Sequence, residues 1–110
     1  PAVDASQLTN IPSPALTIET KSANYTVTTA DDKKVLLVSG ASTITLPAAA
    51  TAGSGFIITI KNTDPVNMIK LDGDGTETID GSEKQWLISQ YSTEVLICDG
   101  TNWIIMQRNN

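Results

Sequence analysis

Short stretches of alternating apolar and polar residues recur along the chain, and this two-residue period predicts β-strands rather than helices. The clearest pair flanks a connector of small residues. Ile44 and Leu46 share one face of the first strand, and Phe56, Ile58 and Ile60 share one face of the second. Threonines occupy much of the opposite faces, so one side of each strand is predicted to face the core.

Turn residues separate further stretches of the same kind, which predict a wholly β protein. The additional strands are expected at residues 16–20, 24–29, 34–39, 67–72, 77–80, 84–90, 93–99 and 102–107. The last two form a hairpin around an Asp-Gly turn. The alanines between Pro47 and Gly53 suffice for one helical turn at most. The expected fold is all-β: a small antiparallel β-sandwich, barrel or prism of about ten short strands.

The first residues lack any hydrophobic period, and the domain is predicted to begin after them. Residues 1–15 form an extended N-terminal arm in this interpretation, and residues 16–110 form a single β domain. Fourteen extended residues reach roughly 45 Å. A frayed terminus and an arm that holds a neighbouring molecule both fit this composition. The arm's apolar and proline positions are its candidate anchors: Val3, Leu8, Ile11, Pro12 and Pro14.

Four of the predicted strands are apolar on both faces, which one small antiparallel domain does not require. They include residues 35–38, 56–58, 95–98 and 103–106. A second apolar face indicates burial against another subunit. The alternative is that these are central strands covered by loops of the same chain.

Charge and composition exclude several classes of partner. The net charge is −5 and the isoelectric point is about 4.4, with no cluster of Lys or Arg. Phosphate-backbone binding needs local positive charge, so neither nucleic acid nor an anionic membrane is expected as a partner. No apolar run approaches the ~20 residues that span a bilayer, and no secretory signal is recognisable.

Candidate chemistry is sparse, and no cofactor, metal or enzymatic activity is expected. The chain has no histidine, which removes Ser-His-Asp and Cys-His catalysis and His-ligated zinc. Its one cysteine, Cys98, lies in an apolar strand and is predicted to be a buried small hydrophobic residue. Five acidic residues between Asp72 and Glu83 contain an Asp-Gly-Asp-Gly run. That run fits ordinary turns better than a calcium loop, and a glycosidase carboxylate pair fits least.

Exposed aromatic side chains could bind a sugar. The candidates are Tyr25, Tyr91, Trp86 and Trp103. Both tryptophans lie in apolar strands and are predicted to belong to the core. Tyr91, between two strands, is predicted to be exposed.

Several segments resemble, in their order along the chain, the β-rich modules of bacteriophage tail fibres and related virion-surface proteins. They are residues 25–38, 44–49, 55–62, 77–81 and 95–103, and the resemblance covers residues 24 to about 106. It implies a non-enzymatic, homotrimeric virion protein, assembled in the cytoplasm of a bacterial host, whose second apolar faces meet near a three-fold axis. The trimer-interface candidates are Leu36, Val38, Ile57, Leu96, Cys98, Ile104 and Met106.

The resemblance leaves two placements on the virion open. A chain of 110 residues that begins at Pro1 with an extended arm fits a capsid decoration (cement) protein, anchored on the major capsid protein or other virion proteins. The alternative is a tail-fibre module that contacts a host surface glycan or protein receptor. A calcium-dependent sugar-binding module is a third possibility.

Overall fold

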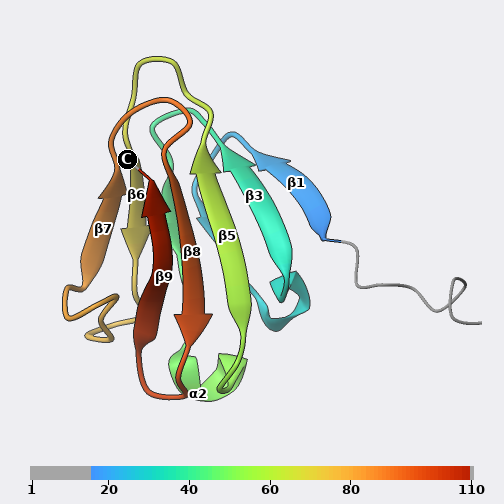
Figure 1. Ribbon diagram of the computed structural model, residues 1–110, viewed down its shortest axis with the longest axis vertical. Helices are drawn as coiled ribbons and strands as arrows, with labels where there is room; N and C mark the ends of the chain where they lie inside the picture. Colours follow the sequence, from blue (N-terminus) through green and yellow to red (C-terminus); the bar gives the residue numbers. More distant parts are fainter. Residues whose placement is uncertain (1–15, 110) are drawn as a thin grey trace, which may run out of the picture.

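Two mixed β-sheets make up the computed structural model, which describes residues 16–109 (Figure 1). The five-stranded sheet has the order β1 (Thr17–Lys21), β3 (Lys34–Val38), β5 (Ile57–Asn62), β8 (Thr93–Cys98) and β9 (Trp103–Asn109). The four-stranded sheet has the order β2 (Tyr25–Thr26), β4 (Thr43–Thr45), β6 (Ile69–Asp72) and β7 (Lys84–Leu87). A 3-10 turn, η1 (Thr29–Asp31), and one short α-helix, α2 (Ala49–Ala52), lie in the connections. The predicted all-β class is confirmed.

The first six strands alternate between the two sheets, so each coil of the chain adds one strand to each sheet. Every second strand then runs in the same direction, and β1, β3 and β5 pair in parallel, as do β2, β4 and β6. Only β5–β8, β6–β7 and β8–β9 are antiparallel among the described strands. The expectation of antiparallel sheets is therefore wrong for the first half of the domain.

The connections explain why neighbouring strands cross between sheets instead of forming hairpins. Pro47 ends the β4 stretch because it has no N–H for a ladder. α2 follows as a single turn, as the alanines predicted, and Gly53 (φ 86°) redirects the chain into β5. Glycine adopts this left-handed conformation without a steric penalty. Turn residues therefore identified the breaks correctly but could not tell a hairpin from a crossover.

One predicted strand, residues 77–80, is almost absent. Only Ile79 makes isolated bridges, to Ser82 and to Trp103. Asp80 (φ 50°) and Gly81 (φ 84°) are both left-handed, and this tight turn stops the strand. The Gln85 side-chain amide donates to the Ile79 carbonyl at 2.8 Å, which occupies a group that a ladder would need.

Side chains from both sheets form one hydrophobic core. The fully buried large residues include Leu36, Ile44, Leu46, Ile58, Ile60, Ile69, Leu71, Ile79, Leu87, Leu96 and Trp103. Phe56 meets Trp103 edge-to-face with ring centroids 5.6 Å apart. Cys98 and Trp103 are buried, and Tyr91 is exposed, as predicted. Trp86 corrects the prediction: it is 44% exposed, because it lies on the face of β7 opposite to buried Leu87.

Asp31 joins the two sheets at one end of the molecule. Its Oδ2 accepts hydrogen bonds from the Tyr25 hydroxyl of β2 at 2.6 Å and from the Thr28 backbone N–H at 2.9 Å. Its Oδ1 pairs with the Lys34 ammonium of β3 at 2.9 Å, and Lys34 also reaches Glu19 of β1 at 2.7 Å. Burial opposes ionisation of Asp31, but these hydrogen bonds outweigh it and lower its pKa to about 2.

The predicted arm, with Val3, Leu8, Ile11, Pro12 and Pro14, lies outside the described residues. Of the domain predicted at 16–110, the structure describes every residue but the last. Between residues 16 and 109 there is no helix of the length and apolar character needed to cross a membrane.

Candidate interaction surface

The five-stranded sheet carries apolar side chains on the side that faces away from the core, and we call this side the outer apolar face. Strand register places its residues in rows. One row runs through Ile18, Val35, Thr59 and Val95, which pair across β1, β3, β5 and β8. Residues in register on neighbouring strands share a face of the sheet. The apolar members of the outer apolar face are Ile18, Val35, Leu37, Ile57, Val95, Ile97, Ile104 and Met106.

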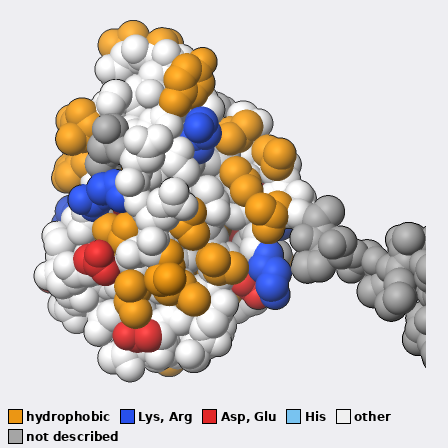
Figure 2. Space-filling model, viewed as in Figure 1, with side chains coloured by type: hydrophobic (Ala, Val, Ile, Leu, Met, Phe, Trp, Pro, Cys, Tyr) orange, Lys and Arg blue, Asp and Glu red, His pale blue; other side chains and the backbone are white. Residues whose placement is uncertain are grey.

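The densest part of the outer apolar face is a row of three isoleucines. Ile57 of β5 pairs with Ile97 of β8, which pairs with Ile104 of β9. Ile104 is 38% exposed and Met106 is 61% exposed, while Ile57 and Ile97 are half-buried by their neighbours. Figure 2 shows hydrophobic side chains gathered over the front strands of this sheet. Such a patch is typical of a protein-protein contact.

Few charges interrupt the outer apolar face. Lys61 belongs to the row of Leu37 and Thr93, and its ammonium lies 5.7 Å from the centre of the Tyr91 ring. A hollow of about 210 Å³ opens beside it, lined by Thr93, Val95, Gln107 and Asn109. A register shift between β8 and β9 at Val95 and Leu96 accompanies the hollow.

The structure divides the seven predicted interface residues between two sides of the sheet. Leu36, Val38, Leu96 and Cys98 are at most 1% exposed. They lie inside the core of the single chain and have no surface to offer a neighbouring subunit, so their assignment to an interface is corrected. Ile57, Ile104 and Met106 lie on the outer apolar face, where the interface assignment remains a prediction.

Sequence reasoning missed five members of the outer apolar face, namely Ile18, Val35, Leu37, Val95 and Ile97. Each is adjacent in sequence to a residue that faces the core. The alternation along each strand contained this information, because successive side chains point to opposite faces. In strands that are apolar on both sides, however, alternation alone does not show which of the two faces is buried in the core.

The outer side of the four-stranded sheet differs in chemistry, and we call it the outer polar face. Its residues are Thr26, Thr43, Thr45, Lys70, Asp72, Lys84 and Trp86. Trp86 pairs with Lys70, whose ammonium lies 5.8 Å from the indole ring centre. Trp86 is the one large hydrophobic side chain among these seven.

Two of the five acidic residues between Asp72 and Glu83 bond to backbone groups of other segments. Glu77 Oε1 accepts from the Ala49 N–H at 2.9 Å, and Asp80 Oδ1 accepts from the Ile105 N–H at 3.0 Å. Across residues 16–109, no three or more His, Cys, Asp or Glu side chains gather as they would around a metal ion. Burial raises the pKa of the Cys98 thiol, which disfavours the reactive thiolate.

A buried carboxylate joins the sheets at the opposite edge from Asp31. Glu94 of β8 is fully buried, and its Oε2 accepts from Arg108 Nε of β9 at 3.0 Å. Arg108 also donates to the Gln85 side chain of β7. Glu94 Oε1 has no hydrogen-bond partner in the described part of the chain. Burial raises the pKa of Glu94, and the nearby Arg108 only partly offsets it.

Comparison with known protein families finds no match, and no curated protein matches the sequence at a significant level.

Proposed function

We propose that the chain is a non-enzymatic structural protein of a bacteriophage virion, which assembles as a homotrimer through the outer apolar face. The observation that carries this proposal is the continuity of that face across all five strands of the larger sheet. In the proposed trimer, each subunit is a small β-sandwich and the three five-stranded sheets face one another as a prism.

The extent of the face supports self-association. Strands lie ~4.8 Å apart and rise ~3.3 Å per residue, so five strands of about five residues form a plane of roughly 24 by 17 Å. This flat extent, roughly 400 Å² before the relief of the side chains is counted, is about half of the ~800 Å² per partner that a standard interface buries. Each Å² of apolar surface removed from water contributes about 25 cal/mol. A second copy of the chain carries the same apolar face, so contact between two copies would remove both faces from water.

We further propose that the trimer decorates a capsid shell and that residues 1–15 anchor it to the major capsid protein or to other virion proteins. These residues join the described domain at β1, which is an edge strand of the five-stranded sheet. In this proposal the arm leaves the domain at that edge and reaches the shell rather than the trimer contact. A tail-fibre module that contacts a host receptor is the second candidate, favoured by the exposed aromatic rings of Trp86 and Tyr91.

Solution mass tests the trimer. Light scattering on the full chain should give three times the subunit mass of 11.7 kDa. Ile97→Lys places a charge in the centre of the isoleucine row and should give the subunit mass. Thr45→Lys makes a comparable change on the outer polar face and should leave the trimer intact. A monomeric wild-type protein would overturn the proposal.

Capsid binding tests the arm separately. Deleting residues 1–14 should abolish binding to shells of the cognate phage while the trimer mass stays unchanged. Full decoration by the truncated trimer would contradict the anchoring role. Adsorption of the wild-type protein to intact host cells, without binding to shells, would favour the tail-fibre alternative.

A further inference from the structure

Two loops lie together at one end of the molecule, beyond the ends of β5 and β7. They are residues 63–68 and residues 88–92 (Figure 1). The Tyr91 N–H donates to the Asn62 carbonyl at 2.5 Å, and the Gln90 side-chain amide donates to the Thr63 carbonyl at 3.4 Å. The loops therefore form one unit at this end of the domain.

This unit exposes four large hydrophobic side chains, and we call them the apolar tip. Val66 is 84% exposed, Ile88 and Tyr91 are each 58% exposed, and Met68 is 48% exposed. Figure 2 shows hydrophobic side chains at this end, apart from those over the strands of the five-stranded sheet. Val66 is more exposed than any other large hydrophobic residue in the described part of the chain.

Hydrogen bonds hold the Val66 loop in place, so the exposure is part of the fold. Asp64 Oδ1 accepts from the backbone N–H groups of Val66 at 2.9 Å and Asn67 at 2.8 Å. Asp64 Oδ2 accepts from the Gly40 N–H at 2.7 Å. The buried Asn62 amide donates to the carbonyls of Asn67 and Leu87, each at 3.0 Å. These bonds use the backbone polar groups and leave the hydrophobic side chains pointing outward.

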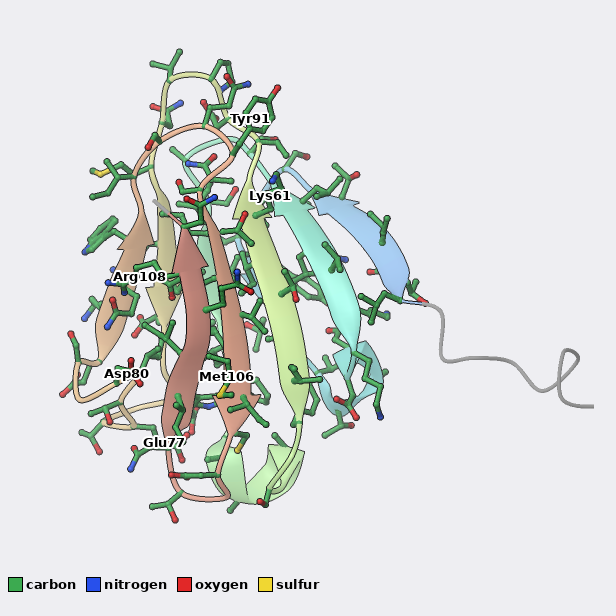
Figure 3. All side chains as sticks on the ribbon, in the orientation of Figure 1. Lys61, Glu77, Asp80, Tyr91, Met106 and Arg108 are labelled. Carbon is green, nitrogen blue, oxygen red and sulfur yellow. The ribbon has the colours of Figure 1, made fainter. Side chains whose placement is uncertain are left out.

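Charge near the apolar tip is opposite in sign to the net charge of the chain. Lys61 lies against the Tyr91 ring and Lys70 against the Trp86 ring. Figure 3 shows Lys61 and Tyr91 side by side near this end, with Asp80 and Glu77 toward the other end. Two carboxylates lie in these loops or next to them in sequence, Asp64 and Glu94, and they are 6% and 0% exposed. Lys61 and Lys70, on the two strands that flank the Val66 loop, are therefore partly exposed cations toward this end.

We propose that the apolar tip docks on the surface of an anionic lipid bilayer. Val66, Met68, Ile88 and Tyr91 enter the headgroup region, and the ammonium groups of Lys61 and Lys70 contact lipid phosphates. Aromatic rings and lysines are the side chains that favour the membrane interface. Cations close to an anionic surface add to the attraction, and salt screens their contribution.

The shape and size of the tip favour lipid over a protein partner. A stable protein interface uses about 20–30 residues a side, and four protruding side chains are too few. Insertion into a headgroup layer needs only a few apolar groups supported by cations. This inference does not depend on the trimer, although three tips on one trimer would bind more strongly through multivalency.

The sequence argued against an anionic membrane because the net charge is −5 and the chain has no cluster of Lys or Arg. Folding places Lys61 on β5 and Lys70 on β6, whose adjoining loop carries Val66 and Met68. The two lysines come close to the apolar tip because the strands that carry them, β5 and β6, are joined by the Val66 loop. Folding also leaves the exposed carboxylates of Asp74, Asp80 and Asp99 in other turns.

Vesicle binding tests the proposal with the full chain. Co-sedimentation with vesicles of phosphatidylglycerol and phosphatidylethanolamine should exceed that with phosphatidylcholine vesicles, and should weaken as salt is added. The double variant Val66→Asp/Ile88→Asp should bind at least about 10-fold more weakly, because it removes apolar contacts and adds like charge. Thr45→Asp on the outer polar face adds the same charge as the single variant Val66→Asp, so it is the control for that variant and should bind as the wild type does.

The solution mass and the thermal unfolding curve of each variant check that it remains folded. We expect it to, because Val66 and Ile88 are both exposed. The single variant Val66→Asp serves if the double variant unfolds. No wild-type binding to anionic vesicles would overturn the proposal, as would equal binding by the tip variant. Loss of shell binding in the tip variant, without any vesicle binding by the wild type, would assign the tip to a protein partner. A changed mass alone would concern only the proposed trimer.

Discussion

The two sheets share one core but present opposite surfaces. On the five-stranded sheet the outward side chains are mainly Ile, Val, Leu and Met, whereas on the four-stranded sheet they are mainly Thr, Lys and Asp. Both sheets obey the same alternation, so the difference is not required by the fold. A sheet with one solvated face needs polar residues there, and only the four-stranded sheet meets this requirement.

Two adjacent residues of β8 show how a core residue differs from a proposed interface residue. On β8, Leu96 is fully buried and the adjacent Ile97 is only half-buried by its own chain. The two side chains are similar in volume and lie on opposite sides of one strand. Their substitution by the same residue should therefore separate folding from assembly.

Leu96→Ala should have the largest effect on the monomer. It opens a cavity in the core and should lower the free energy of unfolding by about 2–5 kcal/mol. Ile97→Ala should change the monomer by less than about 1 kcal/mol, but should weaken association by about 2 kcal/mol, or roughly 30-fold. Urea unfolding at low protein concentration and light scattering across a dilution series measure the two effects.

Equal loss of monomer stability in both variants would contradict the division between the two sides. Unchanged association in Ile97→Ala would remove the isoleucine row from the interface. The low protein concentration matters because association itself stabilises the folded chain.

Asp31→Asn should weaken the junction that holds both surfaces in one domain. The Asp31 carboxylate, with its pKa of about 2 against an ordinary value of 3.8, contributes about 2 kcal/mol near neutral pH. Because the folded pKa is depressed, this stability is present above pH ~4 and is lost as the pH falls toward ~2. The variant should unfold at lower urea concentration at pH 7 and should lose this segment of the pH dependence.

Retention of the wild-type acid transition in Asp31→Asn would show that other carboxylates control it. Glu19, Asp64 and Asp99 are the alternatives, because hydrogen bonds lower the pKa of each of these carboxyl groups.

Glu94→Gln should behave in the opposite way at the other junction. Because burial raises the pKa of Glu94, ionisation of this group destabilises the fold as the pH rises through the folded pKa. Glutamine preserves the shape without the charge, and Arg108 stays 41% exposed and hydrated. The variant should be as stable as the wild type at pH 7, or more stable by about 1 kcal/mol, and the difference should vanish near pH 4.5.

A clear loss of stability at pH 7 would mean that the pair with Arg108 outweighs the burial of Glu94. Chemical unfolding at several pH values distinguishes these outcomes, with Asp31→Asn as the reference of opposite sign.

Much of the fold followed from local patterns, and the rest depended on long-range pairing. Alternation located most strands, and the Asp-Gly turn identified the β8–β9 hairpin correctly. Strand direction was missed because β1 pairs with β3, whereas β2, which lies between them in sequence, belongs to the other sheet. Nothing in a short turn specifies that crossover. The tight turn at Asp80 depended on contacts with Gln85 and Trp103, which are distant in sequence or in another strand.

The candidate surface was predicted as a property of the strands but not as a set of residues. All four of Ile104, Met106, Leu36 and Cys98 were predicted at an interface, but Ile104 and Met106 are exposed, whereas Leu36 and Cys98 are buried in the core. In strands that are apolar at every position, alternation gives two possible faces of equal hydrophobicity. The choice is made by the partner sheet, which only the folded chain supplies.

Trp86→Ala should have the smallest effect and tests the outer polar face directly. Trp86 is 44% exposed and contacts Lys70 across β6 and β7, so its loss should change the free energy of unfolding by about 0.5 kcal/mol or less. The mass in light scattering should stay that of the wild type. Acrylamide quenching should fall, because buried Trp103 becomes the remaining tryptophan. Dissociation of the assembly by this variant would place a subunit contact on the outer polar face, and the assignment of the two faces would have to be reversed.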